Sequence, residues 1–158
     1  MPAPPIVDPA TIDLSHIEYD IEAIRAVNKQ RFEMEQLSAI VRVDVAERLI
    51  IAYKDITEDE FWVRGHIPGR PLMPGVIMCE AVAQAASFLI HHCMDKKPAF
   101  IGFGGMDGVK FRGQVTPGQR FVIVGRIENM RPRLKAFQAQ AFVDGKMVFE
   151  GTIYGLPI

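Results

Sequence analysis

Cysteine, serine and tryptophan are scarce in this chain of 158 residues. It has two cysteines, three serines and one tryptophan. Cys79 and Cys93 are 14 positions apart in one expected helix, which separates their backbones by about 21 Å, whereas a disulfide tolerates at most about 7 Å. We therefore expect free thiols, as in a reducing compartment. Residues 1–14 lack the basic and apolar stretches of a secretory signal, so we expect a cytoplasmic protein.

An excess of either charge is also absent. Lys plus Arg total 18 and Asp plus Glu total 19, giving a formal net charge of -1. This balance argues against nucleic acid or an anionic membrane as the partner, since both favour a strongly basic surface. The apolar run from Val76 to Met94 is interrupted by Glu80, Gln84 and two histidines. A buried core helix therefore explains it better than a membrane span.

The hydrophobic content and the length of the chain indicate one folded domain. Hydrophobic residues make up 49% of the chain, which is enough for one sizeable core in a chain of this length. Residues 1–19 hold four of the eleven prolines and are expected to form an extended or loose N-terminal arm. We assign residues 20–158 to a single domain.

The hydrophobic pattern predicts an α+β fold. A short amphipathic helix is expected over 20–32, and a long, nearly all-apolar helix over 75–94. Asp144-Gly145 predicts a type I′ hairpin. The strand-like runs are 39–45, 49–56, 99–103, 109–115, 120–127, 135–143 and 146–154. One antiparallel sheet wrapped around the long helix would satisfy both the strand patterns and the helix.

His66 opens a segment that reads HIPGRPLMPG. Three prolines and two glycines in ten residues predict a stiff loop. A lone loop histidine is usually a surface residue, but this loop would hold the imidazole with little freedom, as a positioned base requires. Imidazole titrates near neutrality, so a neutral base is available at cellular pH.

Glu80 lies six residues into the apolar helix. At 100° per residue, Gln84, Ser87 and His91 fall within about 40° of it, so the helix carries one narrow polar stripe. The stripe would face solvent in an ordinary helix. A carboxyl in such an apolar setting must otherwise be paired, protonated or hydrated. Because Glu80 closely follows the stiff loop, we favour a functional role for it.

Gly75 and Val76, at the start of the long helix, are a third candidate part of the site, after His66 and Glu80. The first N–H groups of a helix have no internal partner and carry the positive end of its dipole. Gly75 lets another group approach the backbone. These amides are suited to stabilising an enolate-like oxyanion, although Pro-Gly is also an ordinary way to begin a helix.

Other patterns in the sequence give weaker evidence for a functional site. His91, His92 and Cys93 have no second ligand cluster at metal spacing, and no serine lies in a G-x-S-x-G elbow. The glycines of 102–108 do not have the G-x-G-x-x-G spacing. A basic cluster could be a solvated rim or could meet an acidic partner; it comprises Arg126, Arg131, Arg133 and Lys135.

The segment from Gly65 to Gln84 resembles the signature of the 3-hydroxyacyl-acyl-carrier-protein dehydratases of the FabZ/FabA type, with the FabZ branch nearer. Its histidine-to-glutamate spacing and its prolines match, as do the later stretches 108–112, 115–118 and 143–150. The resemblance covers roughly residues 20–155. It departs from the family at Ile67, where an aromatic residue is usual, at Gln119, where an acidic one is common, and across 27–44.

The resemblance implies a hotdog fold, in which a curved antiparallel sheet wraps one long central helix. It implies a homodimer, or a trimer of dimers, with the histidine of one subunit beside the glutamate of the other. His66 would remove a C2 proton from a (3R)-3-hydroxyacyl thioester and Glu80 would protonate or orient the departing C3 hydroxyl. Gly75 and Val76 would bind the thioester carbonyl, and Gln84 would line or support the site.

The same resemblance implies acyl carrier protein as the partner, in fatty acid biosynthesis, with no metal or redox cofactor. Two alternatives stay open from the residues. A hotdog acyl thioesterase would use Glu80 without needing His66. A non-catalytic acyl-chain-binding protein would keep the fold alone, and the divergent 27–44 segment favours it.

Overall fold

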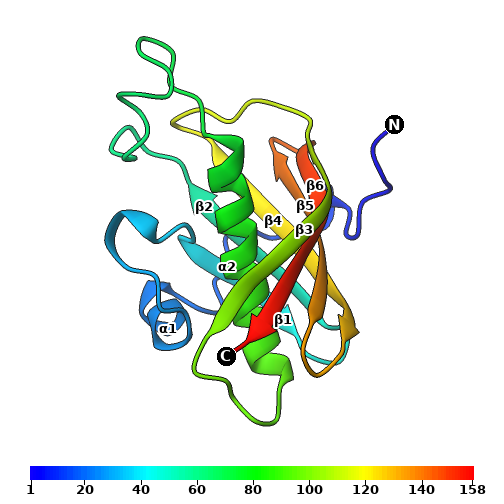
Figure 1. The fold of residues 1–158 in the computed structure, drawn as a ribbon. Helices are drawn as coiled ribbons and strands as arrows, with labels where there is room; N and C mark the ends of the chain where they lie inside the picture. Colours follow the sequence, from blue (N-terminus) through cyan, green and yellow to red (C-terminus); the bar gives the residue numbers. More distant parts are fainter.

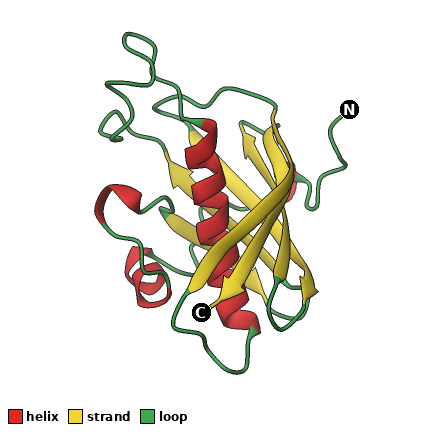
Figure 2. Cartoon of the chain, in the orientation of Figure 1, coloured by secondary structure: helices red, strands yellow, loops and turns green.

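A computed structural model describes all of residues 1–158. It contains one long helix, α2, packed against a six-stranded, wholly antiparallel sheet of order β1-β2-β4-β5-β6-β3 (Figures 1 and 2). The elements are α1 (Ile21–Val27), β1 (Ala39–Asp44), β2 (Leu49–Asp55), α2 (Gly75–Cys93), β3 (Ile101–Phe111), β4 (Arg120–Met130), β5 (Lys135–Val143) and β6 (Lys146–Pro157). The predicted α+β architecture is confirmed.

Helix α2 is the centre of the core. Phe88, Leu89 and Ile90 have no exposed surface, and they join the inward side chains of the sheet in one hydrophobic cluster. The helix is long and apolar enough to cross a membrane by length and composition alone, but most of it is buried inside the protein. The sheet therefore takes up the apolar surface that the sequence pattern assigned to a core helix.

Two strands that the sequence predicted separately are joined in the single strand β3. The runs 99–103 and 109–115 were separated by glycines, but β3 spans 101–111 without a break, pairs with β6, and ends at Phe111 before the second predicted run is complete. Its register shifts twice, between Phe103 and Gly105 and between Asp107 and Lys110. Gly108 has φ +59°, a left-handed conformation that glycine adopts without strain. The glycines therefore create bulges in the strand instead of ending it.

The first helix is shorter than the 20–32 span that its periodicity predicts. Asp20 caps its N-terminus by accepting a hydrogen bond from the Ala23 N–H. It ends at Val27, and the Asn28 side chain then donates to the Gln84 carbonyl of α2. This tertiary contact holds the following segment, residues 28–36, in an irregular path along α2. Periodicity cannot foresee such a contact.

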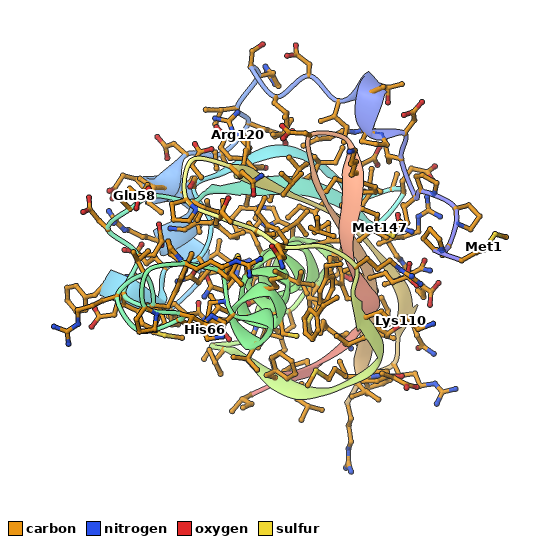
Figure 3. The ribbon with its side chains drawn as sticks, turned by 90° about the horizontal axis from the view of Figure 1, so that it is seen from above. Met1, Glu58, His66, Lys110, Arg120 and Met147 are labelled. Atoms are coloured by element: carbon orange, nitrogen blue, oxygen red, sulfur yellow. The ribbon has the colours of Figure 1, made fainter.

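The N-terminal arm lies across the outer face of the sheet, opposite α2 (Figure 3). The Ile6 N–H donates to the Gln140 side chain, whose Nε2 donates to the Pro4 carbonyl. Apolar side chains of the arm cover a second buried cluster; they are Ile6, Val7, Ile12 and Leu14. The arm is therefore packed against the domain along much of its length.

Strand β3 forms an open edge of the sheet. It pairs with β6 on one side only, as the last strand of the order. Large apolar side chains are exposed along it, including Phe103, Met106 and Phe111. A long apolar edge strand is a template for pairing with another chain.

Candidate active site

His66 is held by its own loop. Its Nδ1 lies 2.8 Å from the Leu72 carbonyl oxygen, and its backbone N–H donates to Trp62. A carbonyl only accepts hydrogen bonds, so Nδ1 carries the ring hydrogen and Nε2 presents a free lone pair. The side chain is exposed. Figure 3 shows His66 beside the N-terminal end of α2.

The N-terminus of α2 offers unpaired amides. The helix begins at Gly75 after Pro74, whose carbonyl accepts from the N–H groups of Ile77 and Met78. The Gly75 and Val76 N–H groups make no hydrogen bond inside the protein. A Cβ at Gly75 would stand 2.8 Å from the Phe111 ring. Only glycine allows that ring to lie against the first turn.

Gln84 orients Glu80. The Gln84 Oε1 accepts from the Gln36 backbone N–H at 2.9 Å, which fixes the direction of the amide. Its Nε2 then donates to the Met34 carbonyl at 2.6 Å and to Glu80 Oε1 at 2.8 Å. Glu80 Oε1 is therefore an acceptor, and in the protonated carboxyl the hydrogen sits on Oε2.

Glu80 lines a cavity of about 160 Å³ beside α2. Eight of its thirteen lining residues are hydrophobic. The hydrophobic ones come from α2, from β3 with the residue before it, and from β6; they are Ala83, Ala86, Ile90, Phe100, Ile101, Phe103, Ile153 and Tyr154. The other polar side chains of the cavity are Gln30, from the 28–36 segment, and Glu80 and Ser87, from α2. The arrangement places one carboxyl at the wall of a cavity most of whose lining residues are hydrophobic.

The four residues of the predicted polar stripe do not all lie at one cavity. Glu80 and Ser87 line the same cavity, and Gln84 is buried beneath it, so the stripe does not face solvent. His91 borders a separate, much smaller cavity. His66 does not line the Glu80 cavity of its own chain. A single protomer therefore leaves the exposed base and the sheltered acid in different surroundings.

The structure adds residues that the motifs did not indicate. Gln30 faces the same cavity as Glu80, while Asn28 and Gln36 bond to Gln84. All three lie in the 27–44 stretch, where the family resemblance is weakest. The available signal was three side-chain amides within nine residues next to a helix. Sequence alone could not pair Asn28 or Gln36 with Gln84, which is 48 or more positions away.

One of the four residues in the predicted basic cluster is buried, and the cluster lies far from the loop that holds His66. Lys135 is 3% exposed, and its Nζ donates to the carbonyls of Arg131 and Pro132. The β4–β5 turn lies near the C-terminal end of α2, at the opposite end of the molecule from the histidine loop (Figure 1). The exposed cations of the histidine loop itself are Arg64 and Arg70.

The other reactive groups of the helix are not activated. Both cysteines are free, as predicted, and burial raises the pKa of each thiol. Burial also lowers the pKa of His91. Thiolates are therefore scarce near neutral pH, which leaves the Glu80 carboxyl as the prominent acid–base group in the cavity.

A curved antiparallel sheet around one long helix, with its site at the first turns of that helix, defines the hotdog class of α+β proteins. Solved structures agree on the fold: the dehydratase heterocomplex ApeI:P from Xenorhabdus doucetiae has a TM-score of 0.70 at 14% identity over 85% of this chain and 90% of that one. Cj0977 of Campylobacter jejuni has a TM-score of 0.65 at 15% identity, over 92% and 95%.

Residues 28–152 match the FabA-like domain, and the chain belongs to that family. Among curated relatives, the 3-hydroxyacyl-[acyl-carrier-protein] dehydratase FabZ of Lactococcus lactis subsp. cremoris is 40% identical over 111 residues, covering 70% of this chain and 77% of the relative. The FabZ of Streptococcus thermophilus is 37% identical over 134 residues, covering 85% and 94%.

Proposed function

We propose that this protein is a hydro-lyase that dehydrates (3R)-3-hydroxyacyl thioesters of acyl carrier protein to trans-2-enoyl thioesters in fatty acid biosynthesis, in the cytoplasm. The observation that carries the proposal is the Glu80 carboxyl, oriented by Gln84 at the wall of a mainly apolar cavity. The FabZ relatives carry the same activity in their names. Hydrophobic lining residues suit an acyl chain, and the proposed reaction uses no cofactor.

In the proposed reaction His66 is the base. With Nδ1 bonded to Leu72, Nε2 is free to accept the C2 proton of the substrate. This proton is weakly acidic because the adjacent thioester carbonyl takes up the charge. The Gly75 and Val76 N–H groups are suited to hold that carbonyl oxygen, since they point out of the positive end of α2.

Glu80 is the proposed acid. Its Oε2 gives a proton to the 3-hydroxyl, the C3–O bond breaks, and water leaves as the C2–C3 double bond forms. His66 ends with one extra proton and Glu80 with one fewer. Transfer of that proton from the imidazolium to the carboxylate, directly or through solvent, restores the resting pair.

We propose that a second copy of the chain completes the site. The base and the acid of one protomer do not share the Glu80 cavity, and β3 is an open edge with exposed Phe103 and Met106. Pairing of two β3 edges would extend the sheet and bring the histidine loop of one copy toward the cavity of the other. Such a homodimer would be two-fold symmetric, with two equal sites.

The proposed docking residues for acyl carrier protein are Arg64 and Arg70. Both are exposed on the loop that holds His66, so a carrier bound there would deliver its thioester to the base. Complementary charge speeds encounter with an acidic carrier and orients it. Charge reversal of both, as Arg64→Glu with Arg70→Glu, should raise KM for the carrier-bound substrate and leave KM for a pantetheine thioester unchanged.

The function is tested by product analysis. The purified protein is incubated with 3-hydroxybutyryl thioester, and enoyl absorbance and free thiol are followed together. Enoyl formation supports the dehydratase. Free thiol would instead identify a thioesterase, especially if His66→Ala keeps full activity. If neither enoyl product nor free thiol forms, the protein is an acyl-binding protein without this activity.

Glu80→Gln should abolish turnover while leaving the fold intact. Glutamine is nearly isosteric and can still accept from Gln84 Nε2, but it cannot supply a proton to the leaving hydroxyl. We expect a loss of activity of at least about 100-fold with an unchanged circular dichroism spectrum. Wild-type rates from the folded variant would remove Glu80 from the mechanism.

A further inference from the structure

Gln30 is a polar side chain of the Glu80 cavity that the mechanism above does not use. It lies in the 28–36 segment and lines the cavity together with Glu80. Its Oε1 is buried without a hydrogen-bond partner, and its Nε2 also makes no hydrogen bond within the protein. A buried amide oxygen without a partner is costly unless a ligand or water satisfies it.

The backbone on both sides of Gln30 is anchored to Gln84. On one side the Asn28 side chain donates to the Gln84 carbonyl, and on the other the Met34 carbonyl accepts from the Gln84 side chain. Arg31 binds the segment internally, donating to the carbonyls of Asn28 and Gln30. The group that aims the Glu80 carboxyl therefore also positions the backbone that carries Gln30.

The other polar side chains of the cavity are less suited to the reacting carbon. Ser87 follows Glu80 by seven residues on α2, about 10 Å along the helix axis. Tyr154 lies on β6, at the wall formed with the start of β3. Gln30 instead lies between two residues, Asn28 and Met34, that bond to Gln84, one turn from Glu80, and it lines the same cavity as Glu80.

We propose that the Gln30 amide hydrogen-bonds the 3-hydroxyl of the substrate and presents an oxygen lone pair of that hydroxyl to Glu80. The inference rests on the proposed dehydratase function. A hydroxyl both donates and accepts, and rotation of the terminal amide brings either its oxygen or its nitrogen to the cavity. Gln30 thereby selects 3-hydroxyacyl chains over saturated chains of equal length.

The test compares a reacting substrate with an analogue that lacks the hydroxyl. Gln30→Met keeps the length of the side chain and removes its amide, and Gln30→Ala is a second variant. Gln138→Met on β5 is the matched control, because Gln138 also makes no side-chain hydrogen bond but lies outside the cavity. Each protein is assayed for kcat/KM with 3-hydroxybutyryl-pantetheine and for inhibition by butyryl-pantetheine.

We expect both Gln30 variants to lose about tenfold in kcat/KM, the equivalent of one hydrogen bond, while the inhibition constant of butyryl-pantetheine stays at its wild-type value. Gln138→Met should match the wild type in both. Unchanged kcat/KM would overturn the inference, as would an equal loss with both compounds, which indicates a structural role. If the wild type itself forms no enoyl product, the proposed function fails first and the inference with it.

Discussion

At the scale of single residues, Gln84 determines what its neighbours can do. It is buried on α2, and all of its polar atoms are used, so its amide has one possible direction. That direction makes Glu80 Oε1 an acceptor and leaves Oε2 for the substrate. The family resemblance implied that Gln84 would line or support the site, and its bond to Glu80 is of the supporting kind.

A second residue-scale contact ties α1 to the 28–36 segment. Arg25 binds Glu35 through two nitrogens, at 2.6 and 2.9 Å, and this pairing lowers the pKa of the Glu35 carboxyl from its ordinary 4.5. A depressed folded-state pKa means that the stabilisation is present above pH 4.5 and is lost as the pH falls through the lower folded-state value.

Glu35→Gln should therefore be less stable than the wild type at pH 7, by a small margin because Arg25 is partly exposed. The margin should shrink below pH 4.5 and vanish once the wild-type carboxyl is protonated. Paired thermal melts from pH 3 to 7 measure it. A constant difference across that range would show that the carboxylate charge contributes nothing.

At the scale of elements, a glycine makes room for a large buried side chain of the neighbouring strand. Gly125 on β4 lies beneath the Phe137 ring of β5, and a Cβ there would stand 1.9 Å from the ring. Phe137 has no exposed surface, so the ring has no room to move aside. The Phe137 ring can therefore lie over the Gly125 backbone only because Gly125 has no side chain.

Gly125→Ala should lower the free energy of unfolding by about 3 kcal/mol, the upper part of the usual range for overpacking a core. Urea denaturation measures the change. Gly65→Ala is the control, because a Cβ at Gly65 meets nothing within 4 Å. Equal stability of the two variants would mean that the sheet accommodates the extra methyl group.

The elements also mark the limits of prediction from sequence. The long helix, the first two strands, β5 and the Asp144-Gly145 turn follow from local patterns, and the structure confirms them. The glycines of β3 instead suggested a break, since a bulged strand is maintained by its partner β6 rather than by its own residues. The end of α1 likewise depends on a distant contact, the bond from Asn28 to Gln84.

At the scale of the whole molecule, the N-terminal arm is an addition outside the 28–152 family match. Its four apolar side chains complete the packing of the outer sheet face, far from α2 (Figure 3). The prolines of residues 1–19 predict an extended or loose arm. Its attachment could not be predicted, because the residues it covers are spread over four strands.

Replacing Ile6, Val7, Ile12 and Leu14 with alanine should cost about 3 kcal/mol of stability, since each side chain is only partly buried. Turnover should be unchanged at temperatures where the variant is folded, because the arm does not reach the cavity. Chemical denaturation and a rate assay measure the two effects. Wild-type stability would show that the arm does not contribute to the folded state.

The whole-molecule claim on which the account depends is that His66 and Glu80 act together from two copies of the chain. Mixing tests it most directly: His66→Ala and Glu80→Gln, each inactive alone, are unfolded together, refolded and assayed for enoyl product. In a two-fold dimer each mixed pair contains one intact site, so random pairing should restore about a quarter of the wild-type activity. If the mixture stays as inactive as its components while forming mixed dimers, the base and the acid do not meet across a subunit boundary.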